Sequence, residues 1–78
     1  MTTAKWEARI RKELVGKTIA KTRYMTAKEC EDAMWDDRPL VIEFTDGSYI
    51  IPMSDDEGNS GGALSTSFDD MPVIPVMR

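Results

Sequence analysis

The strongest structural signal in this chain is the stretch Leu40-Val-Ile-Glu-Phe-Thr-Asp-Gly-Ser-Tyr-Ile-Ile-Pro-Met53. Two apolar, β-branched runs flank Asp46-Gly47, a dipeptide typical of the two-residue type I′ turn of a β-hairpin. Such a turn pairs Thr45 with Ser48, and because strand side chains alternate with period two, six apolar side chains then share one face. These are Leu40, Ile42, Phe44, Tyr49, Ile51 and Met53. We predict that this hairpin forms the centre of the core.

A helix is predicted at the N-terminal end of the chain. Over residues 3–15, Trp6, Ile10 and Leu14 recur every four residues and form one apolar stripe. Threonines precede the helix as N-caps, and Gly16 follows it as a C-terminal residue in the left-handed conformation. The stripe is narrow, which suits a helix that lies on a small sheet or one that docks on a partner.

A strand and a second helix are predicted between this helix and the hairpin. Residues 17–25 are rich in Thr, Ile and Tyr, which favours a strand. Thr26 and Glu29 have the spacing of a capping box, and an apolar staple that includes Cys30 accompanies them. The short helix that follows, with Met34 on its apolar side, must end at residues 35–37 because a proline comes at position 39.

The rest of the chain predicts a loop and a closing strand. Residues 54–62 contain three glycines and no apolar side chain, whereas Pro72 and Pro75 confine the last extended segment to a sheet edge. The expected fold is α+β: a small, strongly bent antiparallel sheet or an SH3-like barrel, with an N-terminal helix and one short inserted helix. We expect one small domain over residues 1–78, with its β-rich core at 17–77.

The composition excludes several chemistries. The 78 residues include no histidine and one cysteine, so the chain cannot form a Ser-His-Asp relay, a Cys-rich metal site or an internal disulfide. We find no catalytic motif and expect neither an enzyme nor a cofactor. Charged residues interrupt the first ten positions, and the longest aliphatic run is three residues. We therefore expect a cytoplasmic protein without membrane contact.

The net charge of −4 conceals two segments of opposite sign. Residues 1–28 carry eight basic and two acidic side chains, whereas residues 29–78 carry two basic and twelve acidic ones, so the segments hold +6 and −10. The basic segment could attract a polyanion, but the larger negative charge opposes it, and we do not expect nucleic acid as a partner. The split favours a protein partner or self-association.

Two groups of residues are candidates for binding. Within the loop 54–62, oxygen-bearing side chains offer the ligands that Ca²⁺ and Mg²⁺ prefer, although the spacing of an EF-hand is absent. These candidate metal ligands are Asp55, Asp56, Glu57 and Asn59. The candidates for protein contact are Trp6, Arg9, Arg11, Lys12 and Trp35. The leading hypothesis is a non-enzymatic protein-interaction module, and the alternative is a small-ligand or divalent-cation binding module centred on this loop.

Five short stretches form a recognisable set. They are Arg23-Tyr-Met-Thr26, Arg38-Pro-Leu-Val-Ile42, Asp46-Gly47, Asp55-Asp-Glu-Gly-Asn59 with Gly62-Ala-Leu64, and Val73-Ile-Pro-Val76. Together they resemble a group of small bacterial and phage proteins that carry no assigned function. The resemblance covers roughly residues 17–77 and implies a stand-alone intracellular protein, with the N-terminal helix as a variable attachment. It implies no activity and no site residues.

Overall fold

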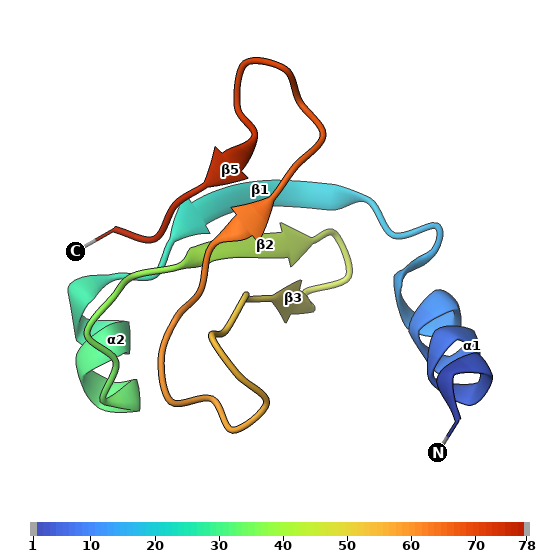
Figure 1. Ribbon diagram of the computed structural model, residues 1–78, viewed down its shortest axis with the longest axis horizontal. Helices are drawn as coiled ribbons and strands as arrows, with labels where there is room; N and C mark the ends of the chain where they lie inside the picture. Colours follow the sequence, from blue (N-terminus) through green and yellow to red (C-terminus); the bar gives the residue numbers. More distant parts are fainter. Residues whose placement is uncertain (1, 78) are drawn as a thin grey trace.

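The computed structural model describes residues 2–77, which form two helices and five short strands (Figure 1). The order is α1 (Thr3–Leu14), β1 (Ile19–Tyr24), α2 (Ala27–Ala33), β2 (Leu40–Phe44), β3 (Tyr49–Ile50), β4 (Leu64–Ser65) and β5 (Val73–Ile74). Strands β1, β2 and β3 form one antiparallel sheet in that order, and β4 pairs with β5 in a second one. The α+β class and the small antiparallel sheets are thus confirmed.

The strands do not close into an SH3-like barrel. Strand β5 pairs with β4 and not with the three-stranded sheet, because Pro72 and Pro75 flank it and remove backbone donors on both sides. Other contacts attach the C-terminal segment to the first sheet. The Tyr24 hydroxyl donates to the carbonyl of Pro75 (3.1 Å), and Arg38 and Met77 exchange two backbone hydrogen bonds. The described strands thus form two separate sheets that these contacts connect.

The β2–β3 hairpin forms, but its predicted register is wrong by one residue. Ile42 pairs with Ile50 instead of Ile51, because the loop has three residues and only Gly47 among them has a positive φ (90°). A type I′ turn would also need a left-handed Asp46. The Asp46 carboxylate instead accepts hydrogen bonds from the backbone N–H (2.9 Å) and the hydroxyl of Ser48.

The register shift changes which side chains are buried. Val41, which the two-residue turn would place opposite the core face, is only 2% exposed and is among the largest fully buried side chains. Tyr49, predicted to be a core residue, is 62% exposed. A one-residue slip exchanges the two faces of a strand relative to its partner, so Val41 and Ile51 now belong to the same cluster.

The second helix begins as predicted and ends early. Thr26 Oγ1 accepts from the N–H of Glu29 (3.1 Å), and Glu29 Oε1 accepts from the N–H of Thr26 (2.8 Å), which completes the capping box. The helix stops at Ala33 because Met34 adopts the left-handed conformation (φ 61°). Met34 is therefore 87% exposed and does not join the apolar side of α2.

The packed part of the molecule lies between α2 and the first sheet. We call it the α2 core, and it consists of Met25, Cys30 and Val41 with the half-buried Trp35 and Ile51. Cys30 is 4% exposed, and burial raises the pKa of its thiol. The buried thiol acts here as a small apolar side chain.

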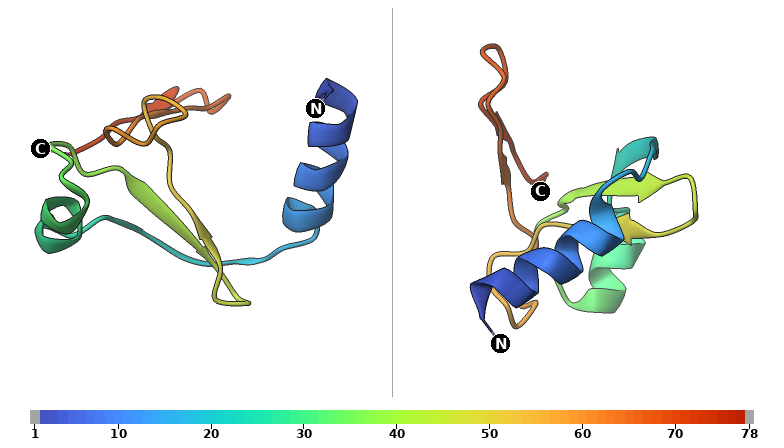
Figure 2. Two further views of the ribbon diagram at one scale, coloured as in Figure 1. Left: turned by 90° about the horizontal axis from the view of Figure 1, so that it is seen from below. Right: turned by 90° about the vertical axis from the view of Figure 1, so that its right-hand side faces the viewer.

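Helix α1 forms as predicted but is not packed. Thr2 Oγ1 accepts from the N–H of Lys5 (3.3 Å), and Gly16 (φ 88°) follows the helix in the left-handed conformation. None of the twelve residues of α1 is buried. Figure 2 shows the helix standing at one side of the molecule, away from α2.

Candidate interaction surface

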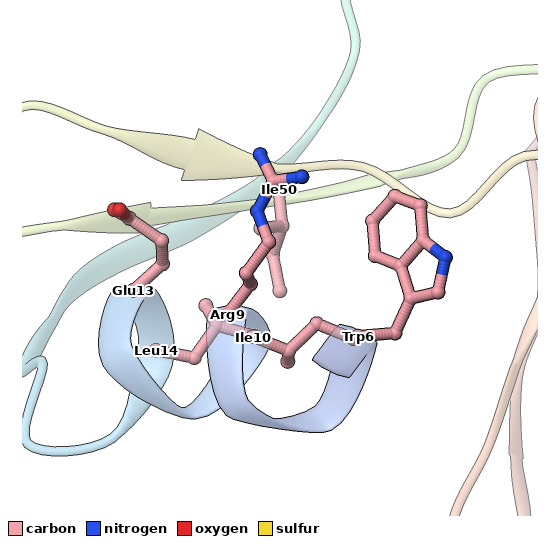
Figure 3. Close-up of a pocket in the computed structure, with 6 residues that line it drawn as sticks. All are labelled: Trp6, Arg9, Ile10, Glu13, Leu14 and Ile50. Carbon is pink, nitrogen blue, oxygen red and sulfur yellow. The ribbon is translucent and has the colours of Figure 1, made fainter. Parts of the chain in front are cut away.

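An exposed apolar stripe runs along α1. We define the α1 stripe as Trp6, Ile10 and Leu14, which are 51%, 48% and 38% exposed. Arg9, Glu13 and Ile50 join them in lining an apolar groove of about 280 Å³ between α1 and β3 (Figure 3). The groove is open to solvent, so the side chains that line it are not covered by another part of the described chain.

Charged side chains flank the stripe. The Arg9 guanidinium lies over the Trp6 ring, 5.5 Å from its centroid, a distance compatible with a cation–π contact. Arg11 flanks the stripe on the other side, whereas Lys12 points away from it; both occupy the last turn, where the helix dipole favours cations. Within residues 2–77, no ion pair involves a side chain of α1.

The positive charge of residues 1–28 divides into two equal groups. Four of the eight basic side chains pair with acidic residues of the same molecule, in the pairs Lys17–Asp46, Lys21–Glu43, Arg23–Glu29, Arg23–Glu43 and Lys28–Asp32. The other four lie on α1 and are Lys5, Arg9, Arg11 and Lys12. Intramolecular neutralisation therefore accounts for half of the basic segment and leaves the cations of the helix available.

The acidic loop uses its carboxylates to hold its own shape. Asp55 Oδ1 accepts from the backbone N–H groups of Glu57, Gly58 and Asn59 at 3.1, 3.0 and 3.4 Å. The Asn59 amide nitrogen donates to Asp55 Oδ2 (3.1 Å), and these hydrogen bonds lower the pKa of Asp55. Asn59 thus presents N–H groups, not the oxygen that a cation would need.

The candidate metal ligands are not brought together as a set. In the part of the chain that the structure describes, no three acidic or thiol side chains are placed to hold a metal ion. Asp55 and Glu57 share the Asn59 amide as a donor, at 3.1 and 3.4 Å, and the neighbouring Asp56 is exposed. The hydrogen bonds of Asp55, Glu57 and Asn59 hold the loop in its conformation, and this geometry gives the cation-binding hypothesis no support.

Trp35 belongs to the α2 core and not to the surface of α1. Its indole N–H donates to the carbonyl of Gly58 (2.7 Å), which joins the α2 core to the acidic loop. Gly61 fits against Pro39 in the same region, where a Cβ atom would come within 2.6 Å of the proline ring. The five predicted contact residues therefore separate: four lie on α1, and Trp35 has a structural role.

A second, more enclosed cavity lies over the face of the first sheet that carries Tyr49 and Ile51, whereas Ile50, between them, lines the groove beside α1. Its volume is about 360 Å³, and its charged lining residues are Arg23, Glu29 and Glu43. The Arg23 guanidinium donates two hydrogen bonds to the Glu29 carboxylate in a bidentate ion pair (2.8 and 3.1 Å), and its Nε lies 3.5 Å from Glu43 Oε2. Lys21 also lies 3.6 Å from Glu43, so each charged lining residue has an ion-pair partner, although among the described residues the buried Glu43 Oε2 accepts no hydrogen bond.

The molecule exposes more surface than a compact monomer of its size. Its accessible surface is 6125 Å², whereas a monomeric protein of 8.8 kDa is expected to expose about 4,800 Å². Its radius of gyration is 13.8 Å, compared with about 11.5 Å for a compact chain of this length. The detached position of α1 contributes to both differences, and so does the projecting β4–β5 segment (Figure 2), where Phe68, Met71 and Val73 are exposed.

Three residues in or beside this surface are not among the predicted contact residues: Ile50, Glu7 and Glu13. Period-two alternation puts Ile50 on the strand face away from Tyr49 and Ile51, but no pattern within the hairpin indicates that it lines the groove beside α1. Glu7 and Glu13 were counted only toward net charge. Their spacing from Arg11 and Arg9, four residues in each case, was the available signal.

No helix within residues 2–77 is long and apolar enough to cross a membrane. Comparison of the chain with protein-family models, with curated proteins and with solved structures finds no match. The resemblance to small bacterial and phage proteins therefore stays a prediction.

Proposed function

We propose that this chain is a non-enzymatic protein-interaction module that docks another protein chain on the α1 stripe. The observation that carries the proposal is a capped helix of twelve residues with no buried residue and three large apolar side chains on one face. Arg9 and Arg11, which flank this face and form no ion pair within residues 2–77, add an electrostatic contribution to docking.

Helix energetics support a covering partner. An isolated helix of about 12–15 residues is marginal in water, and most helices in proteins are stabilised by the packing of one apolar face. Within its own chain, α1 obtains little of that packing. Covering the exposed parts of Trp6, Ile10 and Leu14 would contribute on the order of 1 kcal/mol for each side chain.

The surface area supports the same conclusion. The excess over a compact monomer is about 1,300 Å², and a standard protein–protein interface buries about 800 Å² on each partner. An interface on α1 would cover part of this excess; other exposed apolar side chains, including Phe68, Met71 and Val73, lie outside the helix.

The charged groups support an interaction function over a catalytic one. A general acid or base needs a pKa that is matched to its task and a site within reach of substrate. The Asp55 carboxylate is committed to backbone amides, and the charged residues of the larger cavity are paired with one another. The groove beside α1 is apolar and suits a side chain from another protein.

Photo-crosslinking in cells tests the proposal. A photoreactive amino acid replaces Ile10 in one variant and Lys12 in a control variant, since these positions point about 200° apart around the helix. We expect a discrete protein adduct from position 10 and not from position 12, with its chain identified by peptide mass spectrometry. No protein adduct from position 10, or equal adducts from both positions, would overturn the proposal.

A further inference from the structure

We infer that the chain covering the α1 stripe is a second copy of this protein, held by an antiparallel pair of α1 helices around a two-fold axis at Ile10. The inference rests on the proposed function and names its partner. Three features support it: the order of apolar residues along α1, the charges on its two flanks and the exposed surface of the monomer.

The apolar residues are arranged symmetrically about Ile10. Trp6 lies four residues before it and Leu14 four residues after it, on the same face of the helix. In an antiparallel pair, Ile10 meets Ile10 of the second copy, and Trp6 meets its Leu14. Each contact then occurs twice, as a two-fold interface requires, and a large side chain packs against a smaller one.

The flanking charges have the same symmetry. Arg9 and Glu13 lie on the flank that lines the groove (Figure 3), and helix geometry places Glu7 and Arg11 on the other flank. A two-fold axis at Ile10 brings each flank beside the same flank of the second copy. Arg9 then faces Glu13 of the second copy, and Glu7 faces its Arg11. All the acidic residues of α1 are thereby placed next to opposite charges.

A parallel pair is less favourable for two physical reasons. It would put the two helix N-termini side by side, so that the helix dipoles repel, whereas an antiparallel pair aligns opposite ends. A parallel pair would also place the two large Trp6 side chains against each other at one end of the helix pair and the two smaller Leu14 side chains at the other, so the spacing between the helices would be uneven. The geometry therefore selects the antiparallel arrangement.

The area that two α1 helices can bury limits the affinity of the dimer. Two helices of twelve residues bury less than a standard interface, although Ile50 at the groove adds apolar area. We therefore expect a dimer that forms with increasing concentration. Acidic proteins of other sequence could also reach the cations of α1, and they are the alternative that the experiment must separate.

The test uses two charge-reversal variants of the whole chain, studied separately and as a mixture. Light scattering and sedimentation measure their mass over a range of concentrations. We expect the wild-type chain to approach twice its mass of 8.8 kDa as concentration rises. Arg9→Glu and Glu13→Arg each bring like charges together at two symmetric positions, and each should weaken dimerisation by about tenfold or more.

An equimolar mixture of the two variants should recover dimerisation. In the mixed dimer, Glu at position 9 faces Arg at position 13, and Glu13 faces Arg9, so both contacts are attractive again. The matched control is Lys12→Glu, which changes charge as Arg9→Glu does but lies away from the stripe, and it should dimerise like wild type. Circular dichroism checks that the variants retain the fold.

Three results would overturn the inference. They are a wild-type monomer at every concentration, a dimer that survives Ile10→Asp, and a mixture that dimerises no better than the single variants. If position 10 crosslinks to a protein of other sequence while the purified chain remains monomeric, the second copy is excluded and the interaction function stands. No adduct at all from position 10 overturns both.

Discussion

Helices α1 and α2 begin with the same kind of threonine cap, yet they differ in what they contribute to the fold. The shorter helix, α2, places Cys30 against Met25 and Val41 in the α2 core. The longer helix, α1, has a complete apolar stripe and buries nothing. The comparison shows that capping specifies where a helix starts, whereas packing determines whether the helix stabilises the domain. In so small a chain, the apolar face left over is available for another molecule.

The largest difference between the two regions is expected from truncation of an apolar side chain. Val41→Ala removes two methyl groups from a fully buried site and should lower the free energy of unfolding by about 2 kcal/mol. The matched change Ile10→Ala on α1 should alter it by less than about 0.5 kcal/mol. Urea unfolding at low protein concentration measures both, and equal losses would contradict the comparison.

The two tryptophans give a smaller contrast. Trp35→Phe removes the indole N–H and leaves the carbonyl of Gly58 without its 2.7 Å donor, which should cost about 1 kcal/mol. Trp6→Phe should leave the monomer stability almost unchanged, because Trp6 is half exposed, belongs to no buried cluster and contacts Arg9 of its own helix through a ring that Phe retains in smaller form. Urea unfolding followed by far-ultraviolet circular dichroism distinguishes them, and a larger effect at Trp6 would be inconsistent with the structure.

Loss of the N-cap should destabilise the domain more at α2 than at α1. Thr26→Ala removes one half of a capping box in a packed helix and should destabilise the whole domain by about 1 kcal/mol. Thr2→Ala should increase fraying of α1 without changing global unfolding. Amide hydrogen exchange reports both effects, with rapid exchange throughout α1 even in the wild-type monomer. Strong protection of α1 in the dilute wild-type protein would show that the helix is packed within its own chain.

Acid should weaken the region around α2. The Arg23 side chain, followed by the Thr26 backbone, lowers the pKa of Glu29 to about 2, below an unfolded value of about 4.3. A lowered pKa contributes stability above the unfolded value, and this is lost as the pH falls toward 2. Lys17 lowers the pKa of Asp46 in the same way. Thermal melts from pH 6 to 2 measure the loss.

Glu29→Gln is the control for this pH dependence. It keeps a side-chain acceptor for the Thr26 N–H but removes the titrating charge. The melting temperature of this variant should therefore fall less between pH 4.3 and pH 2 than that of the wild type. An equal fall in both proteins would place the acid sensitivity elsewhere.

Features encoded by neighbouring residues could be predicted. The cap at Thr26, the glycine after α1 and the turn at Asp46-Gly47 all depend on a few adjacent positions, and all three occur at the expected places. The exact turn type could not be predicted, because two-residue and three-residue loops both accept Asp-Gly. In the structure, Lys17, which lies 29 positions away in the sequence, pairs with Asp46 beside Ser48.

The candidate surface could be predicted only in part. The stripe of α1 and its cations follow from periodicity, but their exposure does not, because the same stripe would suit a helix packed on its own sheet. Likewise, Trp35 could not be assigned to the interior from its position near a helix end. Its hydrogen bond to Gly58 joins segments that are 23 positions apart.

Local chemistry in the sequence accounts for the elements, their caps and the exclusion of histidine- and disulfide-based chemistry. Tertiary contacts account for the hairpin register, for the open sheets and for which cations remain unpaired. The +6 and −10 segments show most clearly why the sequence alone does not determine which charges are neutralised. Charge is a property of composition, but neutralisation depends on which side chains come within about 4 Å of each other after folding. Folding pairs four of the eight basic residues in the segment 1–28 and leaves the other four on a helix that no other part of residues 2–77 covers.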